Sequence, residues 1–167
     1  MSPTGHLAIG FAAKKYAPRI PLIVFLIAAY AIDLIYFIFL ALGIDKLDYD
    51  PWSHSLFMAV IWSVSAGLIT LLFSKNFRSG LVIALVVFSH WILDIIVWDN
   101  VPLFFNKTLR IGFGLYNKIG FSLTGLKFDS GTVVATAIEL GMLVMGLIIY
   151  FLYLRKLRKE KRVLSLN

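Results

Sequence analysis

Residues 80–98 read GLVIALVVFSHWILDIIVW, and this stretch decides the fold class. As an α-helix it is long enough to cross about 30 Å of hydrocarbon, and it contains no Lys, Arg or Glu. It nevertheless carries His90 and Asp94, although an ionisable side chain at the centre of a membrane helix costs about 2.5–3.5 kcal/mol. The stretch therefore predicts a transmembrane helix whose two ionisable residues are there for a specific reason.

The rest of the chain has the same apolar character. Of its 167 residues, 60% are hydrophobic and 15% are charged, whereas a soluble domain has about 45–50% apolar and 25% charged residues. A single small domain cannot bury so many large side chains, so lipid is their simplest solvent. Three more stretches are long enough to span a bilayer, at residues 20–43, 55–74 and 132–154. We predict an all-α integral membrane protein, a single membrane domain over residues 1–167 with about four transmembrane helices.

Besides the short connections at residues 44–54 and 75–79, three segments lie outside these predicted spans. Residues 4–16 are expected to form a short helix with Thr4 as its N-cap, too short to span and therefore interfacial or re-entrant. Residues 99–131 are rich in Gly, Asn and aromatic residues and form a long outer loop against the bilayer surface. Residues 155–167 form a basic tail after an apolar run, which is typical of an anchor to anionic lipid. Membrane lipid is thus the expected partner, and nucleic acid is not.

The basic residues predict the orientation in the membrane. Eleven of them fall on the side of the tail and five on the other side. By the positive-inside rule both termini are cytoplasmic, in the cell membrane (the inner membrane) of a prokaryote. The eleven are Lys14, Lys15, Arg19, Lys75, Arg78, Arg155, Lys156, Arg158, Lys159, Lys161 and Arg162, and the five are Lys46, Lys107, Arg110, Lys118 and Lys127.

Ionisable side chains from three spans fall at nearly one depth. Counted from the side of the tail at about 1.5 Å per residue, Asp33 lies at about 20 Å and Glu139 at about 18 Å. His90 and Asp94 lie at about 15 and 21 Å. His90 and Asp94 share one helical face, so they can chelate a divalent ion, or Asp94 can hold the tautomer of His90. No Lys or Arg lies within the spans, so the carboxylates are either protonated or compensated by histidine or a metal.

Two further histidines can join this cluster. His54 stands at the start of the second span, and a re-entrant N-terminal helix would lift His6 roughly 12 Å into the membrane. Imidazole and carboxylate ligands favour Zn²⁺, with Mn²⁺ or Fe²⁺ as alternatives. The absence of cysteine excludes thiolate zinc sites and cysteine nucleophiles. For any single histidine, a hydrogen-bond bridge between helices is the simpler alternative.

Four motifs follow one another along the chain: Thr4-Gly5-His6, the lone Asp33, Trp52-Ser53-His54-Ser55-Leu56 and Ser89-His90-Trp91-Ile92-Leu93-Asp94. In these motifs the chain resembles the predicted membrane-bound metal-dependent hydrolases, the YdjM-like family, from residue 4 to about 98 and more loosely over 112–117 and at Glu139. The resemblance implies a multi-span bundle that binds a divalent metal, with a distant similarity to zinc-dependent phospholipase C and nuclease folds. The ligands it implies are His6, Asp33, His54, His90 and Asp94.

The chain departs from the better-known pattern of that family in two places. Asp33 stands alone where those members have a paired-acid motif, and Tyr49-Asp50 stands where they have a His-Arg pair. A second metal ion would therefore need Asp50 or Glu139 in place of the missing ligands.

The leading functional hypothesis is a metal-dependent hydrolase of a lipid or lipid-linked phosphoester. Such a metal activates water and polarises a phosphoryl oxygen, and Glu139 or Asp94, as a carboxylate off the metal, would accept the proton of the water. A site at this depth favours substrates whose tails stay in the membrane. The side chains expected to hold the anionic headgroup lie in the outer loop and are Lys107, Arg110, Asn117 and Lys118.

Two alternatives belong to other classes of protein. Intramembrane Asp, Glu and His also build ion and proton pathways, although this chain is small for a transporter, shows no inverted repeat and would have to oligomerise. The polar groups can also merely join the helices of a scaffold, but interhelical hydrogen bonds are worth only about 0.6 kcal/mol on average. The substrate, the number of metal ions and the oligomeric state do not follow from the sequence.

Overall fold

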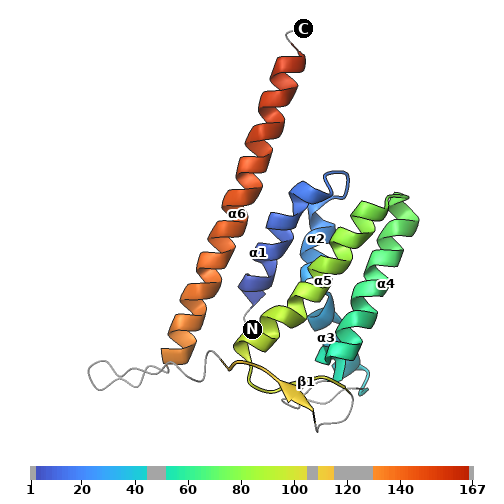
Figure 1. Ribbon diagram of the computed structural model, residues 1–167, viewed down its shortest axis with the longest axis vertical. Coiled ribbons are helices and arrows are strands. Elements are labelled where there is room, and N and C mark those ends of the chain that lie inside the picture. The colour runs from blue at the N-terminus through green and yellow to red at the C-terminus, as the bar shows by residue number, and fades with distance from the viewer. Residues whose placement is uncertain (1–2, 45–51, 105–108, 115–129, 166–167) are drawn as a thin grey trace.

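The computed structural model describes residues 3–44, 52–104, 109–114 and 130–165, and the regular secondary structure of this part of the chain is helical apart from one pair of two-residue strands (Figure 1). The prediction of an all-α fold is confirmed. In chain order the elements are α1 (Pro3–Ala13), the 3-10 helix η1 (Lys14–Tyr16), α2 (Leu22–Ala29), α3 (Ala31–Ala41), the 3-10 helix η2 (Trp52–His54), α4 (Leu56–Ser74), α5 (Phe77–Val97), β1 (Val101–Pro102), β2 (Arg110–Ile111) and α6 (Ser130–Leu164).

Among the described residues, three helices are long and apolar enough to cross a membrane: α4, α5 and the part of α6 from Thr136 to Leu164. α2 and α3 meet at Tyr30 with a bend of 59°, and they make a fourth if the bent pair is counted as one span. The structure thus differs from the continuous helix predicted over residues 20–43. The chain turns at Tyr30 although neither Gly nor Pro stands between residues 22 and 41.

α4 and α5 form a hairpin whose two helices each begin at a side-chain cap. The Ser55 hydroxyl accepts a hydrogen bond from the Met58 amide at 3.3 Å, and Asn76 Oδ1 accepts one from the Ser79 amide at 3.0 Å. Between the two helices Lys75 takes the left-handed conformation, with φ 50°. These local features place α5, which carries His90, firmly against α4.

Glycines bring helices close together at two crossings. A Cβ added to Gly80 of α5 would lie 2.7 Å from the carbonyl oxygen of Gly67 in α4. A Cβ added to Gly146 of α6 would lie 2.7 Å from the Cα of Ala8 in α1. Small residues allow such backbone approach between membrane helices. α6 is therefore joined to the rest of the bundle through α1 and η1.

α1 lies inside the bundle, in contact with α2, α5 and α6 (Figure 1). Packing on three helices is what we expect of a re-entrant segment more than of an interfacial one, and the placement of α1 in a membrane stays a prediction. The turn after α1 is fixed by Lys14, whose Nζ donates to the carbonyl oxygens of Pro18 at 2.7 Å and Ile20 at 2.5 Å. This placement carries His6 into the interior.

The two ends of the bundle differ in charge. Figure 1 shows the end of α1, the α4–α5 connection and the end of α6 at one end, and the strand pair at the other. We call the first the basic end, because the residues around it include Lys14, Lys15, Lys75, Arg78 and the basic residues from 155 to 162. The predicted tail is helical as far as Leu164, in continuation of α6. Placement of the basic end and of both termini on the cytoplasmic side stays a prediction.

The described part of the predicted outer loop folds back on the end of α5. β1 pairs with β2 in antiparallel fashion. The Phe113 amide donates to the Ile95 carbonyl at 2.7 Å, and the Gly114 amide donates to the Trp98 carbonyl at 3.2 Å. A side chain on Gly112 would collide with the Trp98 carbonyl, so this close approach requires glycine.

Candidate metal centre

Ionisable side chains from four elements meet inside the bundle. Three of them are almost fully buried: His6 is 2% exposed, His90 1% and Asp94 4%. Within the described residues they form two groups that share His90, and in each group the ligand-type atoms all lie within 4.8 Å of one another. One group is His6 of α1, Asp33 of α3 and His90 of α5, and the other is His54 of η2, His90 and Asp94 of α5. The structure thus brings together all five of the side chains that the sequence predicts as ligands.

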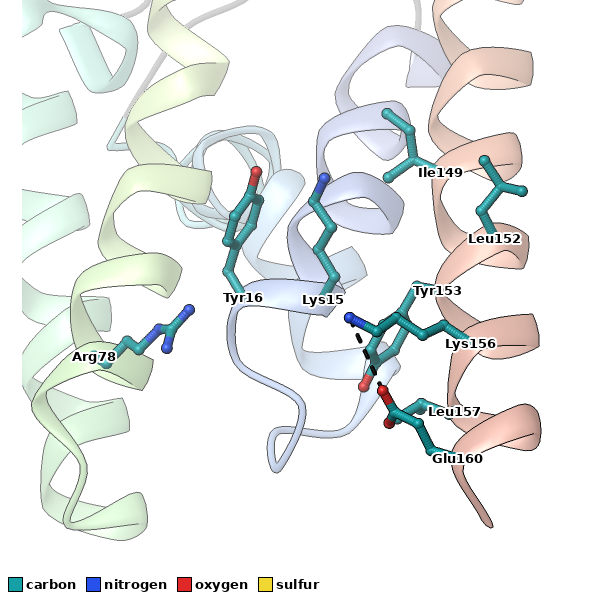
Figure 2. A pocket seen from close by; sticks show the side chains of 9 residues that line it. All are labelled: Lys15, Tyr16, Arg78, Ile149, Leu152, Tyr153, Lys156, Leu157 and Glu160. Carbon is teal, nitrogen blue, oxygen red and sulfur yellow. Dashed lines mark ion pairs between the residues drawn. The ribbon is translucent and has the colours of Figure 1, made fainter. Parts of the chain in front are cut away.

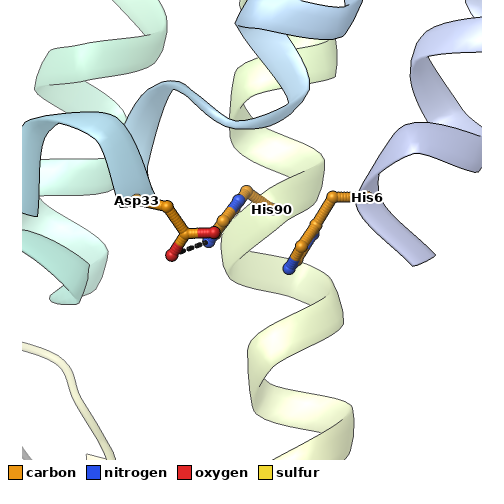
Figure 3. A group of neighbouring side chains, drawn as sticks. All are labelled: His6, Asp33 and His90. Carbon is orange, nitrogen blue, oxygen red and sulfur yellow. Dashed lines mark ion pairs between the residues drawn. The ribbon is translucent and has the colours of Figure 1, made fainter. Parts of the chain in front are cut away.

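His90 lies at the centre of the cluster. Its Nε2 is 3.5 Å from Asp33 Oδ1 (Figure 3) and 3.3 Å from Asp94 Oδ2. Its Nδ1 is 3.0 Å from the carbonyl oxygen of Ala29, at the break between α2 and α3. A carbonyl oxygen only accepts hydrogen bonds, so Nδ1 of His90 carries the proton. The bend at Tyr30 therefore supplies the carbonyl that fixes the His90 tautomer.

This tautomer decides the chemistry at the opposite nitrogen. A neutral His90 presents the lone pair of Nε2 to two carboxylates, which is unfavourable without a positive charge between them. The charge can be a proton on Nε2 or a metal ion shared by the imidazole and the carboxylates. A histidine that donates its other N–H to a backbone carbonyl is the usual arrangement around a ligated metal.

His54 reaches the same carboxylate from η2. Its Nε2 is 3.2 Å from Asp33 Oδ1, the oxygen that also faces His90, and its Nδ1 is 3.2 Å from the Ser53 hydroxyl. Ser53 is fully buried, and its hydroxyl oxygen can accept a hydrogen bond from Nδ1–H of His54, as the Ala29 carbonyl does from Nδ1–H of His90. One oxygen of Asp33 is thus approached by two imidazole nitrogens.

His6 completes the cluster from α1. Its ring is stacked on that of His90, with centroids 3.8 Å apart and an interplanar angle of 5°. Its Nε2 lies 3.9 Å from Asp94 Oδ1, and its buried Nδ1 has no hydrogen-bond partner among the described residues. A buried polar atom left in this state costs about 1–3 kcal/mol. An ion or a water held by His6 would remove that cost.

The spacing of these atoms fits a small divalent ion. Ligands at about 2.0–2.1 Å from a tetrahedral Zn²⁺ lie about 3.3–3.4 Å from one another. The distances from His54 and His90 to their carboxylate oxygens are 3.2, 3.3 and 3.5 Å. The donor set of imidazole and carboxylate suits Zn²⁺, Mn²⁺ or Fe²⁺. The residues present therefore fit the metal that the sequence predicts.

Glu139 lies outside both groups. It is 1% exposed, and its Oε2 accepts a hydrogen bond of 2.9 Å from the Thr4 hydroxyl, two residues before His6 in α1. Glu139 thus ties α6 to the helix that carries His6. Its predicted role as a general base stays a prediction, whereas Asp94, the other predicted base, lies within the cluster.

The predicted headgroup-binding residues lie mostly outside the described part of the chain. The residues outside it are Lys107, Asn117 and Lys118. Asp50, which the sequence offers as a ligand of a second metal ion, also lies outside it. Arg110 is described and lies in β2, where a guanidinium nitrogen donates to Asn100 Oδ1 at 2.6 Å. It stands at the strand-pair end of the bundle.

Two tyrosines beside the histidines were not predicted. The Tyr30 ring stands edge-on to His6 with centroids 6.3 Å apart, and the Tyr36 ring stands edge-on to His54 at 5.6 Å. Tyr36 follows Asp33 by three residues, so the helical spacing alone places the two on one face. Nothing in the sequence singles out Tyr30, because its position depends on the break.

Comparison of the chain with protein-family profiles, with curated proteins and with solved structures finds no match.

Proposed function

We propose that this protein is a membrane-embedded metal-dependent hydrolase that acts on a lipid or lipid-linked phosphoester. The observation that carries the proposal is the environment of His90, whose Nδ1 is held by the Ala29 carbonyl while its Nε2 faces Asp33 and Asp94. This is the environment of a metal ligand with its supporting hydrogen bond. The resemblance to the YdjM-like hydrolases points to the same activity.

The roles of the side chains follow from their positions. His6, Asp33, His54, His90 and Asp94 would hold the ion. A divalent ion bound there supplies Lewis acidity for a phosphoryl oxygen and makes water a nucleophile near neutral pH. Asp94 has one oxygen toward His90 and the other toward His6, so one oxygen would hold the ion while the other, off the metal, would accept a proton from water.

The depth of the cluster favours a membrane-anchored substrate. His90 is 13 residues from Phe77 at the basic end of α5 and seven from Val97 at the other end, which corresponds to about 20 and about 10 Å. A reacting group would therefore enter from the strand-pair end, where Arg110 lies. A phosphoester near the headgroup level of that leaflet meets this requirement while its tails stay in the hydrocarbon.

The test combines metal content with turnover. The full chain is purified in detergent without added metal, its metal content is measured by mass spectrometry, and phospholipids and a polyprenyl-linked phosphoester are assayed with and without chelator. We expect bound Zn²⁺, Mn²⁺ or Fe²⁺ and hydrolysis that chelator abolishes. The variant Ser89→Ala should keep both the metal and the activity, because the Ser89 hydroxyl donates to the Val86 carbonyl at 2.7 Å within α5 and takes no part in the cluster. Hydrolysis that chelator leaves intact would refute the proposal.

A second candidate function, proton or ion translocation, is favoured by one observation. His54, Asp33, His90 and Asp94 form a continuous series of contacts of 3.2–3.5 Å, and chains of this kind carry protons in pumps and transporters. Liposomes that contain the protein distinguish the two functions. Proton flux that disappears in Asp33→Asn, in protein that holds no metal, would favour translocation over hydrolysis.

A further inference from the structure

A second polar site lies at the basic end, far from the histidines. It is a cavity of about 640 Å³ between η1, the start of α5 and the last turns of α6 (Figure 2). We call it the basic cleft. Its lining consists of Lys15, Tyr16, Arg78, Ile149, Leu152, Tyr153, Lys156, Leu157 and Glu160. A volume of this size is in the range of small-molecule sites, which is about 300–1,000 Å³.

We propose that the basic cleft binds the headgroup of one anionic phospholipid from the surrounding leaflet. This inference is independent of the proposed hydrolase activity. The headgroup would be held by Lys15, Arg78 and Lys156, and the first part of its acyl chains by Ile149 and Leu152.

The charge of the cleft fits a phosphate diester. Lys15, Arg78 and Lys156 come from three different elements, and Figure 2 shows Arg78 and Lys156 reaching toward η1 from opposite walls. The single carboxylate, Glu160, forms only a long contact of 3.9 Å with Lys156, and both side chains are exposed. The cleft therefore carries a net positive charge. Arg is suited to bidentate phosphate contacts, and Lys acts as a point charge.

The two adjacent lysines that follow α1 have different contacts. The neighbouring Lys14 is used internally, since its Nζ donates to the carbonyl oxygens of Pro18 and Ile20. Lys15 instead lies over the Tyr16 ring, with Nζ 4.8 Å from the centroid, at the lining of the cleft. Of two adjacent lysines, one holds the turn and the other faces the cleft.

The order of residues along α6 distinguishes a lipid from a soluble anion. Ile149, Leu152, Tyr153 and Lys156 recur at three- and four-residue intervals, so they share one helical face. Ile149 and Lys156 are separated by about 10 Å along the helix. Ile149 and Leu152 precede Lys156 along α6, on the side away from the basic end, which is the order of acyl chain and headgroup in a phospholipid (Figure 2).

A bound lipid would also add a link between α5 and α6. Both helices contact α1, but α6 packs chiefly on α1 and α5 packs chiefly on α4. A headgroup held by Arg78 of α5 and Lys156 of α6 would connect the two helices directly. We expect anionic lipid to raise the thermal stability of the protein.

The test is native mass spectrometry of the full chain released from detergent, with phosphatidylglycerol, phosphatidylcholine or inorganic phosphate added. The cleft variant is Lys15→Gln/Arg78→Gln/Lys156→Gln. The matched control, Arg158→Gln/Lys161→Gln/Arg162→Gln, removes the same charge from α6 outside the cleft. We expect one retained phosphatidylglycerol per chain, no retained phosphatidylcholine, and about 100-fold weaker phosphatidylglycerol binding in the cleft variant alone.

Three results would overturn the proposal. An equal loss of phosphatidylglycerol binding in the cleft variant and the control would mean that the basic end attracts anionic lipid by its overall charge and not through a specific site. Competition by millimolar inorganic phosphate would make the site one for free anions. If the cleft variant fails to fold, the wild-type protein decides the question: equal retention of phosphatidylglycerol and phosphatidylcholine, or equal protection against thermal unfolding by both, contradicts a headgroup site.

Discussion

α5 and α6 are both long apolar helices that carry a buried carboxylate, yet the two carboxylates have different surroundings. Asp94 of α5 lies with histidines from α1 and its own helix, within a cluster to which α3 and η2 also contribute. Glu139 of α6 lies outside that cluster and accepts a hydrogen bond from Thr4. The difference teaches that a buried carboxylate indicates chemistry where several ionisable groups converge on it, and indicates helix packing where its hydrogen bond joins two helices.

The largest expected effect is that of His90→Ala, which removes the residue that the two ligand groups share. Loss of an outer-shell partner costs about 10–100-fold in metal affinity or activity, so loss of this central ligand should exceed about 100-fold. The measurement is metal per protein together with phosphoester hydrolysis. Full metal occupancy in this variant would show that His90 is not a ligand.

Asp94→Asn and Glu139→Gln test the comparison directly. Asp94→Asn keeps the shape of the side chain and removes its charge, so we expect metal affinity and activity to fall by about 10–100-fold. Glu139→Gln retains a carbonyl that can accept from the Thr4 hydroxyl, so we expect unchanged metal content and an activity loss below about tenfold. A much larger loss of activity with metal retained would make Glu139 the general base.

Gly146→Ala tests the packing of α6 on α1. The added Cβ would lie 2.5 Å from the Ala8 carbonyl oxygen, so the helices must separate, at a cost of about 1–3 kcal/mol. Gly141→Ala in the same helix is the control, because nothing lies within 4 Å of its Cβ position. Thermal unfolding in detergent should show a lower midpoint for the first variant and an equal or higher one for the second. Equal midpoints would contradict the close contact.

The smallest expected effect is that of Thr4→Val, which removes the hydroxyl that donates to Glu139. Interhelical hydrogen bonds in membranes are worth about 0.6 kcal/mol on average and at most about 1.7 kcal/mol. We expect a loss of stability in this range, with metal content unchanged, by thermal unfolding and metal analysis. Loss of the metal would mean that this bond holds His6 in place.

Much of the fold was predictable, because it depends on apolar length. The spans corresponding to α4, α5 and α6 need only enough apolar residues to cross the hydrocarbon. The common depth of Asp33, His90 and Asp94 was also predictable, since helical rise is constant. The sequence therefore predicts which side chains lie at one depth, but not the contacts that they make there.

What was not predictable depends on tertiary contacts. The break at Tyr30 has no Gly or Pro to signal it, and the carbonyl of Ala29 at the break accepts from His90, a residue 61 positions away. The partner of Glu139 is likewise remote, since Thr4 is 135 positions away. The predicted depth of Glu139 is the same as that of the cluster. In the structure, however, Glu139 faces α1 and accepts a hydrogen bond from Thr4.

The most direct test of the central claim is X-ray absorption at the edge of the metal that copurifies with the full chain. The account predicts a shell of N and O ligands, at about 2.0–2.1 Å for Zn²⁺, with imidazole scattering that is weakened in His54→Ala and lost with the metal in His54→Ala/His90→Ala. Protein that is folded and free of metal, or a metal shell that the double variant leaves unchanged, would contradict it.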